Sequence, residues 1–269
     1  MDGKWPIGEV AKLFDVSTDT LRFYEKEGIL PALKNKENGY RYYSYNEMVV
    51  LMDILFFRNM ELSVKDIKQI VTKMEIGDIK GLLYENQKIV WKRIQELTKL
   101  QKMIDRAASH YALCEQWLGK FQIVPAPDFQ YKLLDKQEDD LVAIIQRYKQ
   151  SDWGWTDRIR YTLLLTQKEL LKTPGFLFAR AGISLDKEDF VHLPVSERQE
   201  LAALTESEYL YTVIGTNYQE QEHIGLKSAL QYLKRERREV RGPLLARYMA
   251  SSHKDGVDYY EVWVAVQAY

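Results

Sequence analysis

Apolar residues recur at helical spacing near the start of the chain. Ile7, Val10, Ala11 and Phe14 fall on one face of a helix, a pattern typical of an amphipathic segment packed on a core. A short turn follows, and the next segment is a second helix, predicted from Thr18 to about Lys26. These two helices and the turn between them predict a helix-turn-helix.

The caps and turns around these helices extend the prediction. Ser17 is the expected N-cap of the second helix and Gly28 its terminator. From Pro31 to Tyr43 the pattern predicts a hairpin, with Asn38-Gly39 at its turn. A capping box from Ser44 to Glu47 opens a helix over 48–58, and Ser63 caps another. The outline is that of a winged helix, assigned to residues 1–77.

The middle of the chain carries a heptad pattern without proline. Two seams run through it three residues apart, the second apolar only in its later half: Leu83, Val90, Leu97, Ile104, Tyr111 and Leu118, then Asn86, Arg93, Leu100, Ala107 and Cys114. Such heptads predict one long helix in a coiled coil. A helix of this length cannot bury its seam inside one small domain, so we expect a homodimer through residues 78–119. Packing on its own chain is the alternative.

After a linker predicted at 120–127, residues 128–269 form a mixed domain with an internal repeat. The order strand-helix-strand-strand is predicted twice, at 141–148, 156–171, 176–184 and 189–195, and at 209–216, 219–238, 244–251 and 258–266. The overall fold class is α+β. Two such units can join edge to edge, and we expect a ligand cleft between their helices and the sheet.

Composition excludes several classes of protein. The 269 residues contain one cysteine, so they form no internal disulfide and no multi-thiolate metal site. No signal peptide or membrane span is apparent, which predicts a cytoplasmic location without membrane contact. The formal net charge is −1, and this balance gives no sign of nucleic-acid binding. No cofactor is expected.

Specific residues in the first 72 positions change that picture. The segments Ile7–Lys12, Val16–Gly28 and Asn38–Tyr43 closely resemble the MerR family of bacterial transcription regulators. Residues 128–269 resemble, more weakly, the gyrase-inhibitor-like effector-binding domain of multidrug-sensing members, through the repeat and the ending Tyr260–Val266. The resemblance implies an antiparallel coiled-coil dimer in the bacterial nucleoid. It also implies activation by bending and untwisting a pseudo-palindromic promoter, acting on RNA polymerase indirectly.

In a helix-turn-helix the second helix enters the major groove with its N-terminal residues at the base edges. Arg22 is the expected base reader, because its planar fork can bond guanine through two hydrogen bonds. Pairing of Arg22 with Glu25, or with another acid next to Lys26, is the alternative. Arg41 is expected to reach phosphate, supported by a tyrosine hydroxyl. The complete predicted DNA-binding set is Ser17, Thr18, Thr20, Arg22, Tyr24, Lys26, Tyr40, Arg41, Tyr42, Arg58 and Lys65.

The C-terminal domain is expected to bind a small organic, aromatic ligand. Cys114 and His110 lie four residues apart, but the seam position of Cys114 predicts a buried structural thiol, so no metal site is expected. Aromatic walls suit flat ligands through stacking and cation–π attraction. The predicted effector-binding residues are Trp153, Trp155, Tyr161, Phe178, His192, Tyr218, Tyr248, Tyr259, Glu261 and Trp263.

Strand alternation places Glu261 on one face with Tyr259 and Trp263, and an all-apolar set on the other. A carboxylate there can pair with a cationic ligand, and the repeat places His192 at the matching position. The strand before it contains no acid, unlike that of multidrug-sensing relatives. A neutral or anionic ligand met by Arg247 or His192 therefore stays open.

Two other functions are alternatives to the effector-responsive activator. The first is a ligand-independent DNA-bending repressor whose C-terminal domain is structural. The second is a small hydrolase with Glu261 as base. The sequence offers no nucleophile, base and orienting residue together, so we expect no enzyme.

Overall fold

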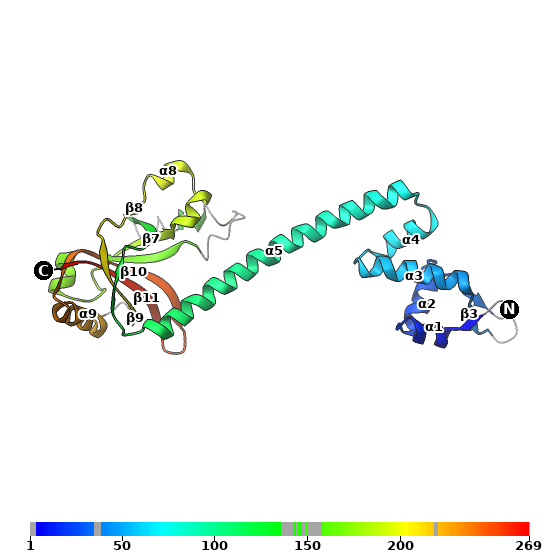
Figure 1. The fold of residues 1–269 in the computed structure, drawn as a ribbon, viewed down its shortest axis with the longest axis horizontal. Helices are drawn as coiled ribbons and strands as arrows, with labels where there is room; N and C mark the ends of the chain where they lie inside the picture. The colour runs from blue at the N-terminus through cyan, green and yellow to red at the C-terminus, as the bar shows by residue number, and fades with distance from the viewer. Residues whose placement is uncertain are drawn as a thin grey trace. The chain divides into compact units, whose positions relative to one another are not determined.

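The computed structural model describes residues 4–34, 39–135, 142–143, 145–146, 149, 158–217 and 220–268. The chain divides into two compact units, Met1–Glu96 and Leu97–Tyr269. Helix α5, Ile76–Trp117, is continuous through the boundary (Figure 1). The predicted three-part division therefore becomes two units, each of which contains part of the long helix.

The first unit is a helical domain with a small sheet. Its strands form one antiparallel sheet in the order β1-β3-β2. The elements before α5 are β1 (Trp5–Pro6), α1 (Ile7–Leu13), α2 (Thr18–Lys26), β2 (Leu33–Lys34), β3 (Arg41–Tyr43), α3 (Tyr45–Asn59) and α4 (Val64–Thr72).

The capping residues and turn glycines of this unit lie where the sequence predicts them, at the ends of the predicted helices and in the hairpin. The Ser17 side chain accepts a hydrogen bond from the Thr20 amide at the start of α2. Ser44 and Glu47 form the capping box of α3, and Ser63 caps α4. Gly28 and Gly39 have φ of +70° and +69°, conformations that cost glycine little because it lacks a Cβ. The mixed fold with a winged helix-turn-helix and a long helix is confirmed.

The core of the first unit also fixes the start of α5. Leu21, Leu51, Ile54 and Ile67 are fully buried, and Leu82 and Leu83 of α5 pack against this core. The side-chain amide of Asn86 donates to the carbonyl of Met60 at 2.9 Å.

The two heptad seams of α5 have different environments. Five members of the first seam are exposed, Val90, Leu97, Ile104, Tyr111 and Leu118, with exposed fractions of 41–57%. The second seam ends at Cys114, which is buried against Tyr211, Val213 and Met249 of the same chain. The alternative of self-packing thus holds for the C-terminal part of the second seam, whereas these five residues of the first seam are exposed.

The second unit is built on one eight-stranded sheet in the order β4-β9-β11-β10-β6-β7-β5-β8. Every described strand pair in it is antiparallel. Its strands are β4 (Gln122–Pro125), β5 (Phe129–Leu133), β6 (Arg160–Leu165), β7 (Arg180–Asp186), β8 (Ala202–Ala203), β9 (Glu208–Thr216), β10 (Arg238–Ser252) and β11 (Val257–Ala268). The helices are α7 (Gln167–Lys172), η2 (Lys187–His192), α8 (Val195–Arg198) and α9 (Ile224–Arg235).

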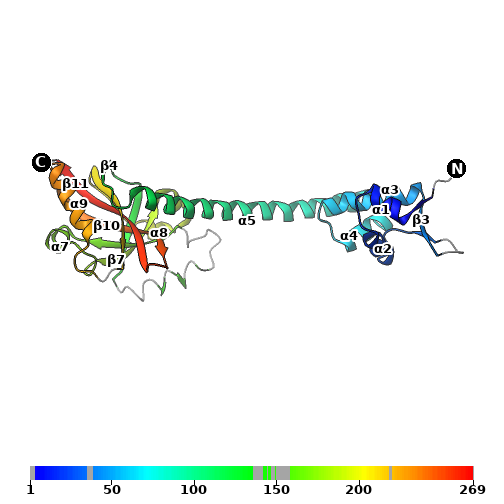
Figure 2. The ribbon, with the colours of Figure 1, turned by 90° about the horizontal axis from the view of Figure 1, so that it is seen from below.

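The two faces of this sheet are covered differently. Tyr260, Val262, Val264 and Val266 of β11 form the main core with residues of α7 and α9, and α9 lies alongside β10 and β11 (Figure 2). The opposite face packs on the C-terminal part of α5 through Leu113, Cys114 and Trp117. The predicted all-apolar face of β11 is therefore confirmed.

The second copy of the predicted repeat is close to the structure. In the first copy the strand predicted at 176–184 overlaps β7, but the other described elements differ from the prediction. The predicted helix over 156–171 contains strand β6, because Tyr161, Leu163 and Leu165 alternate with Arg160, Thr162 and Leu164 at a period of two. The helix begins only at Gln167, with Thr166 as its N-cap and Glu169 completing the capping box. Of the predicted strand 141–148, the described residues 142–143 and 145–146 are helical.

The predicted strand 189–195 is also wrong, because these residues belong to η2, a turn and the start of α8. The sheet still has internal symmetry: β9-β11-β10 mirrors β5-β7-β6 across the β10–β6 pair. The symmetric counterpart of β11 is therefore β7, so the proposed match of His192 to Glu261 fails. The predicted linker 120–127 contains β4, which pairs with β9.

Candidate DNA interface and effector pocket

The N-terminal turn of α2 displays polar side chains. The hydroxyls of Ser17 and Thr20 lie 2.9 Å apart, and Thr18 and Thr20 are half-buried. Arg22 is 55% exposed and its Nη1 donates to Asp19 at 3.0 Å. The acid that pairs with Arg22 is thus Asp19 and not Glu25, which pairs with Lys34 and Arg41. Such an exposed pair holds its arginine weakly. Lys26, at the end of the same helix, is exposed.

Tyr24 does not belong to this surface. It is 5% exposed and packs in the core with Leu21, so its predicted DNA contact is wrong. The neighbouring Phe23 is 44% exposed instead. The helical spacing of Leu21 and Tyr24, three residues apart, was the signal that could have separated the two rings.

Glu25 joins the hairpin to α2. Its carboxylate forms ion pairs with Nε of Arg41 and, at 2.9 Å, with Nζ of Lys34. Burial raises the pKa of Glu25, but the hydrogen bonds from Arg41 and Lys34 outweigh it and leave the pKa below its ordinary value. The wing cations are thereby held close to the second helix.

The hairpin tyrosines take three different positions. Tyr40 is 63% exposed, Tyr42 is half-buried and Tyr43 is fully buried. Burial raises the pKa of Tyr43 and keeps its hydroxyl protonated. Tyr40 and Tyr42 therefore have surface to offer a phosphate, whereas Tyr43 is a core residue.

The turn between α3 and α4 carries two more of the predicted cations. Nη1 of Arg58 donates to the carbonyl of Leu62 at 2.6 Å, which closes the turn. Lys65 is exposed at the start of α4. Both residues lie in the region of the expected second wing, and Arg58 also has a structural role that spacing did not reveal.

The predicted effector residues are not gathered into one site. Trp153, Trp155 and Tyr218 lie outside the described residues. Tyr161 packs against the core under the helices. Phe178 is 57% exposed between α7 and β7, and His192 lies at the end of η2. The expected cleft between helices and sheet is filled by this core.

A buried cluster of charges surrounds Glu261 on the opposite face of the sheet. Glu261 is 6% exposed and its Oε1 lies 2.9 Å from Nη1 of Arg160 and 3.1 Å from Nη1 of Arg247. Arg247 also donates to Asp186 at 2.8 Å and to Ser184 at 2.9 Å. The Glu261 carboxylate is therefore engaged by two arginines, and its predicted role as an open partner for a cationic ligand is wrong.

The pKa of Asp186 follows from this cluster. Burial alone would raise it, but Arg247 and Arg160 outweigh that effect and leave the pKa below its ordinary value. Asp186 is thus an anion that compensates the buried arginines. Arg160 and Asp186 were missed from the sequence, because the strand containing Arg160 was read as a helix.

Trp263 and Tyr259 belong to the packing beside this cluster. Trp263 lies 4.7 Å from the ring of Tyr211 and 6.0 Å from that of Phe129, centroid to centroid. Phe129 in turn stacks under Arg247, with 3.9 Å between the guanidinium carbon and the ring centroid. Tyr259 and Trp263 pack against the cluster that contains Cys114.

The predicted buried thiol is confirmed. Burial, with a smaller effect of Glu261, raises the pKa of Cys114 to about 11, so the thiol stays protonated near neutral pH and is a poor metal ligand. Within the described ranges, no group of three or more His, Cys, Asp or Glu side chains is placed to hold a metal ion.

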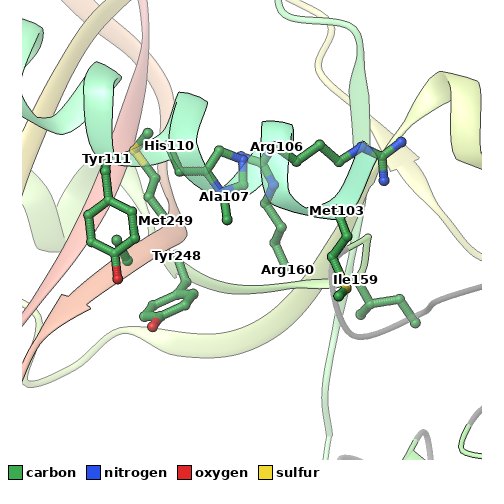
Figure 3. Close-up of a pocket in the computed structure, with 10 residues that line it drawn as sticks. Met103, Arg106, Ala107, His110, Tyr111, Ile159, Arg160, Tyr248 and Met249 are labelled. Carbon is green, nitrogen blue, oxygen red and sulfur yellow. The ribbon is translucent and has the colours of Figure 1, made fainter. Parts of the chain in front are cut away.

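One hollow of about 240 Å³ lies between α5 and the sheet, next to the charge cluster (Figure 3). Tyr248 is the predicted effector residue that lines it. Tyr111 and Tyr248 stand at one end, Met103 and Ile159 at the other, and Arg160 points in between them. A pocket with apolar walls and a few polar groups suits a small organic ligand.

The described helices include none long and apolar enough to cross a membrane.

Residues 6–43 match the family model described as MerR family regulatory protein. A multidrug-efflux transporter 2 regulator of Bacillus subtilis is 34% identical over 97 residues, 36% of this chain and 36% of that protein. An uncharacterized HTH-type transcriptional regulator of Haemophilus influenzae is 32% identical over 124 residues, 44% of this chain and 91% of that protein.

Among solved structures, a MerR family regulator lacking the sensor domain and bound to promoter DNA, HiNmlR, is 26% identical with a TM-score of 0.33, covering 42% of this chain and 94% of that one. The chain thus spans only about a third of the length of the Bacillus regulator, whereas it covers most of the Haemophilus protein. These named relatives are transcriptional regulators, not enzymes. With its helix-turn-helix, hairpin and long helix, the chain belongs to the MerR family of DNA-binding regulatory proteins.

Proposed function

We propose that this protein is a dimeric, effector-responsive transcription regulator that reads promoter DNA with α2. The observation that carries the proposal is the capped N-terminal turn of α2, which presents Thr20 and a 55% exposed Arg22 in a chain of this family. A guanidinium held only by a surface ion pair can exchange it for a guanine edge at low cost. Thr18 and Thr20 lie beside it.

Further polar groups of the first unit, exposed or half-buried, are proposed to bind phosphates. Arg41 and Tyr40 of the hairpin, with Tyr42, would contact one strand, and Lys26, Arg58 and Lys65 would contact the backbone further along. Glu25 supports this role, because it fixes the wing cations beside α2. Ser17 has a capping role and keeps the helix N-terminus oriented toward phosphate.

The exposed first seam of α5 supports a homodimer through residues 78–119. Leu97 and Ile104 are each 57% exposed on this seam, and apolar residues repeated every seven positions gain most by packing on a second helix. In the proposed antiparallel coiled coil, each protomer would bind one half of a pseudo-palindromic promoter.

The second unit is proposed to be the sensor, of the gyrase-inhibitor-like type. Its single sheet is symmetric, because the strand order β9-β11-β10 in one half is mirrored by β6-β7-β5 in the other. This symmetry supports the interpretation. The hollow beside α5 is the proposed site of a small organic ligand. Because α5 belongs to both units, ligand binding against it can change how DNA is held and so favour promoter distortion and activation.

Footprinting on duplex DNA selected from a random library by binding to the protein tests this proposal. We expect protection of two half-sites, with hypersensitive positions between them that strengthen when an aromatic ligand is added. Protection that is identical with and without every ligand tested, together with repression in a transcription assay, would support the ligand-independent repressor instead.

The dimer is tested separately by sedimentation of the full chain. Ile104→Glu places a charge on the exposed seam, and Lys102→Glu, two residues away, is the matched control. We expect only Ile104→Glu to shift the protein toward monomer. A wild-type protein that sediments as a monomer at micromolar concentration would contradict the proposed coiled coil.

A further inference from the structure

The hollow beside α5 has two ends of different chemistry. Its walls are mainly apolar, from Met103 and Ala107 of α5, Ile159, and Met249 of β10. Tyr111 and Tyr248 bring their rings to one end, as Figure 3 shows. Its volume of about 240 Å³ admits a ligand with one or two fused rings. These features fit an aromatic body without specifying its charge.

The charged groups that line the hollow are both arginines, Arg106 and Arg160. Among the described residues, no Asp or Glu lines it. His110 adds no charge of its own, because burial, together with Arg160 and Arg247, lowers its pKa to about 4. The ionisable lining is therefore positive at neutral pH.

Arg160 has donor capacity left in this environment. Nη1 donates to Glu261 at 2.9 Å and Nη2 lies 3.5 Å from Asp186, a long contact. Its Nε is buried and has no acceptor within the described part of the chain. Nε has almost no open surface, so the donor that a ligand oxygen would engage is Nη2, whose contact with Asp186 is long.

We infer that the hollow is an effector site for an aromatic anion, a ring of one or two cycles bearing a carboxylate, which Arg160 and Arg106 would bind while Tyr111 and Tyr248 stack on the ring. This inference rests on the proposed function, since it names the ligand class of the proposed sensor. A charge-assisted hydrogen bond between guanidinium and carboxylate is among the strongest available to a binding site.

A cationic ligand is disfavoured by the same geometry. It would face two arginines at close range, and Glu261, an acid of the adjoining cluster, already contacts both Arg160 and Arg247. Only the tyrosine rings would attract it.

The site also brings the ligand into contact with both α5 and the sheet. Arg106 of α5 already contacts Glu188 at 3.0 Å and Asp189 at 3.5 Å on η2. A ligand carboxylate that binds Arg106 competes with these acids and changes how α5 is held against η2. Ligand charge is thereby coupled to the helix that continues into the DNA-binding unit.

The test is calorimetric titration of the full chain with three naphthalenes of nearly equal size: 1-naphthoate, 1-naphthamide and 1-naphthylmethylammonium. We expect 1-naphthoate to bind at least tenfold more tightly than the amine, with the amide between them. Arg106→Gln is expected to weaken 1-naphthoate at least fivefold and to leave the amide nearly unchanged. Arg235→Gln, an exposed arginine of α9, is the matched control.

A second variant tests the location without touching a charge. Ala107→Phe fills the hollow and should abolish binding of 1-naphthoate, whereas Ala108→Phe, the next residue of the same helix, should not. Tighter binding of the amine, no binding of any probe at 1 mM, or equal binding by the two phenylalanine variants would overturn the inference.

Failure of the proposed function has a different signature. If 1-naphthoate binds as expected but neither footprint nor transcription changes, the anion site stands and effector-responsive regulation fails. If DNA binding responds to the cationic probe instead, regulation stands and the ligand class assigned to the hollow is wrong.

Discussion

The arginines of the two units are held in opposite ways. Arg22 in the first unit is 55% exposed and pairs with Asp19, which is 84% exposed. Arg247 in the second unit is 3% exposed and is held by Asp186, Glu261 and Ser184. An exposed cation costs little to release to a new partner, whereas a buried one must keep every acid around it. The first arrangement suits DNA reading, and the second fixes a sheet.

The comparison also explains how a chain of net charge −1 can belong to a family of DNA-binding proteins. The first 72 residues are not basic in sum, but several of their cations are exposed beside α2 and in the hairpin. In the second unit Arg160 and Arg247 are held against acids inside the protein and are not available to phosphate. Non-specific DNA affinity, which depends on summed phosphate neutralisation, should therefore be modest.

The largest expected effect comes from breaking the buried cluster. Arg247→Met leaves Asp186 and Glu261 short of a partner in a buried site, and we expect the second unit to lose about 3–5 kcal/mol of unfolding free energy. Urea titration followed by circular dichroism measures this. The control is Arg235→Met, because Arg235 is 74% exposed on α9. Equal urea midpoints of unfolding for the two variants would show that burial of the arginine does not decide its contribution to stability.

The exposed arginine is expected to matter for binding and not for folding. Arg22→Ala should cost about 1–3 kcal/mol of specific DNA binding if Arg22 reads a base, with little change in the urea midpoint. Gel-shift titrations on the specific promoter and on a scrambled duplex measure the specific and the non-specific DNA affinity. An equal loss on the two duplexes would mean that Arg22 contacts phosphate instead of a base.

Glu25 lies between the two extremes, with a side chain 17% exposed. Its pKa is lower in the folded protein than its ordinary value of 4.5. Its contribution to stability is therefore complete above that value and is lost as the pH falls through the lower, folded pKa. We expect the first unit to lose stability as the pH falls below about 5, and Glu25→Gln to flatten that dependence in acid melting curves. Glu27→Gln is the neighbouring control, and parallel curves for wild type and Glu25→Gln would contradict the proposed anchor.

The smallest effect is expected at Asp19. Asp19→Asn removes the surface partner of Arg22, and the change in stability should stay within about 0.5 kcal/mol. Specific DNA affinity should rise slightly, because Arg22 no longer has to leave a carboxylate. Fluorescence anisotropy with labelled promoter can resolve this, and weaker binding would show that Asp19 itself helps to position the arginine.

Prediction from sequence succeeded where short-range chemistry decides the structure. Ser17, the Ser44–Glu47 capping box and Ser63 each act within one helical turn, so α2, α3 and α4 could be located from them. It failed at β6, where a run of leucines with a capping box behind it was read as one helix. It also failed at η2, because the predicted strand there has no neighbour in the sheet to pair with.

The sequence by itself determined the winged helix-turn-helix, the long heptad helix and the family, since caps, turns and periodicity are local properties. It also determined the two faces of β11, because alternation along a strand needs no knowledge of its neighbours. Only the tertiary structure decided that Arg160, Arg247, Asp186 and Glu261 meet. They come from four strands whose order, β11-β10-β6-β7, is set by long-range pairing. The charge of the proposed ligand rests on Arg160 together with Arg106 of α5, which only the tertiary structure brings to one hollow.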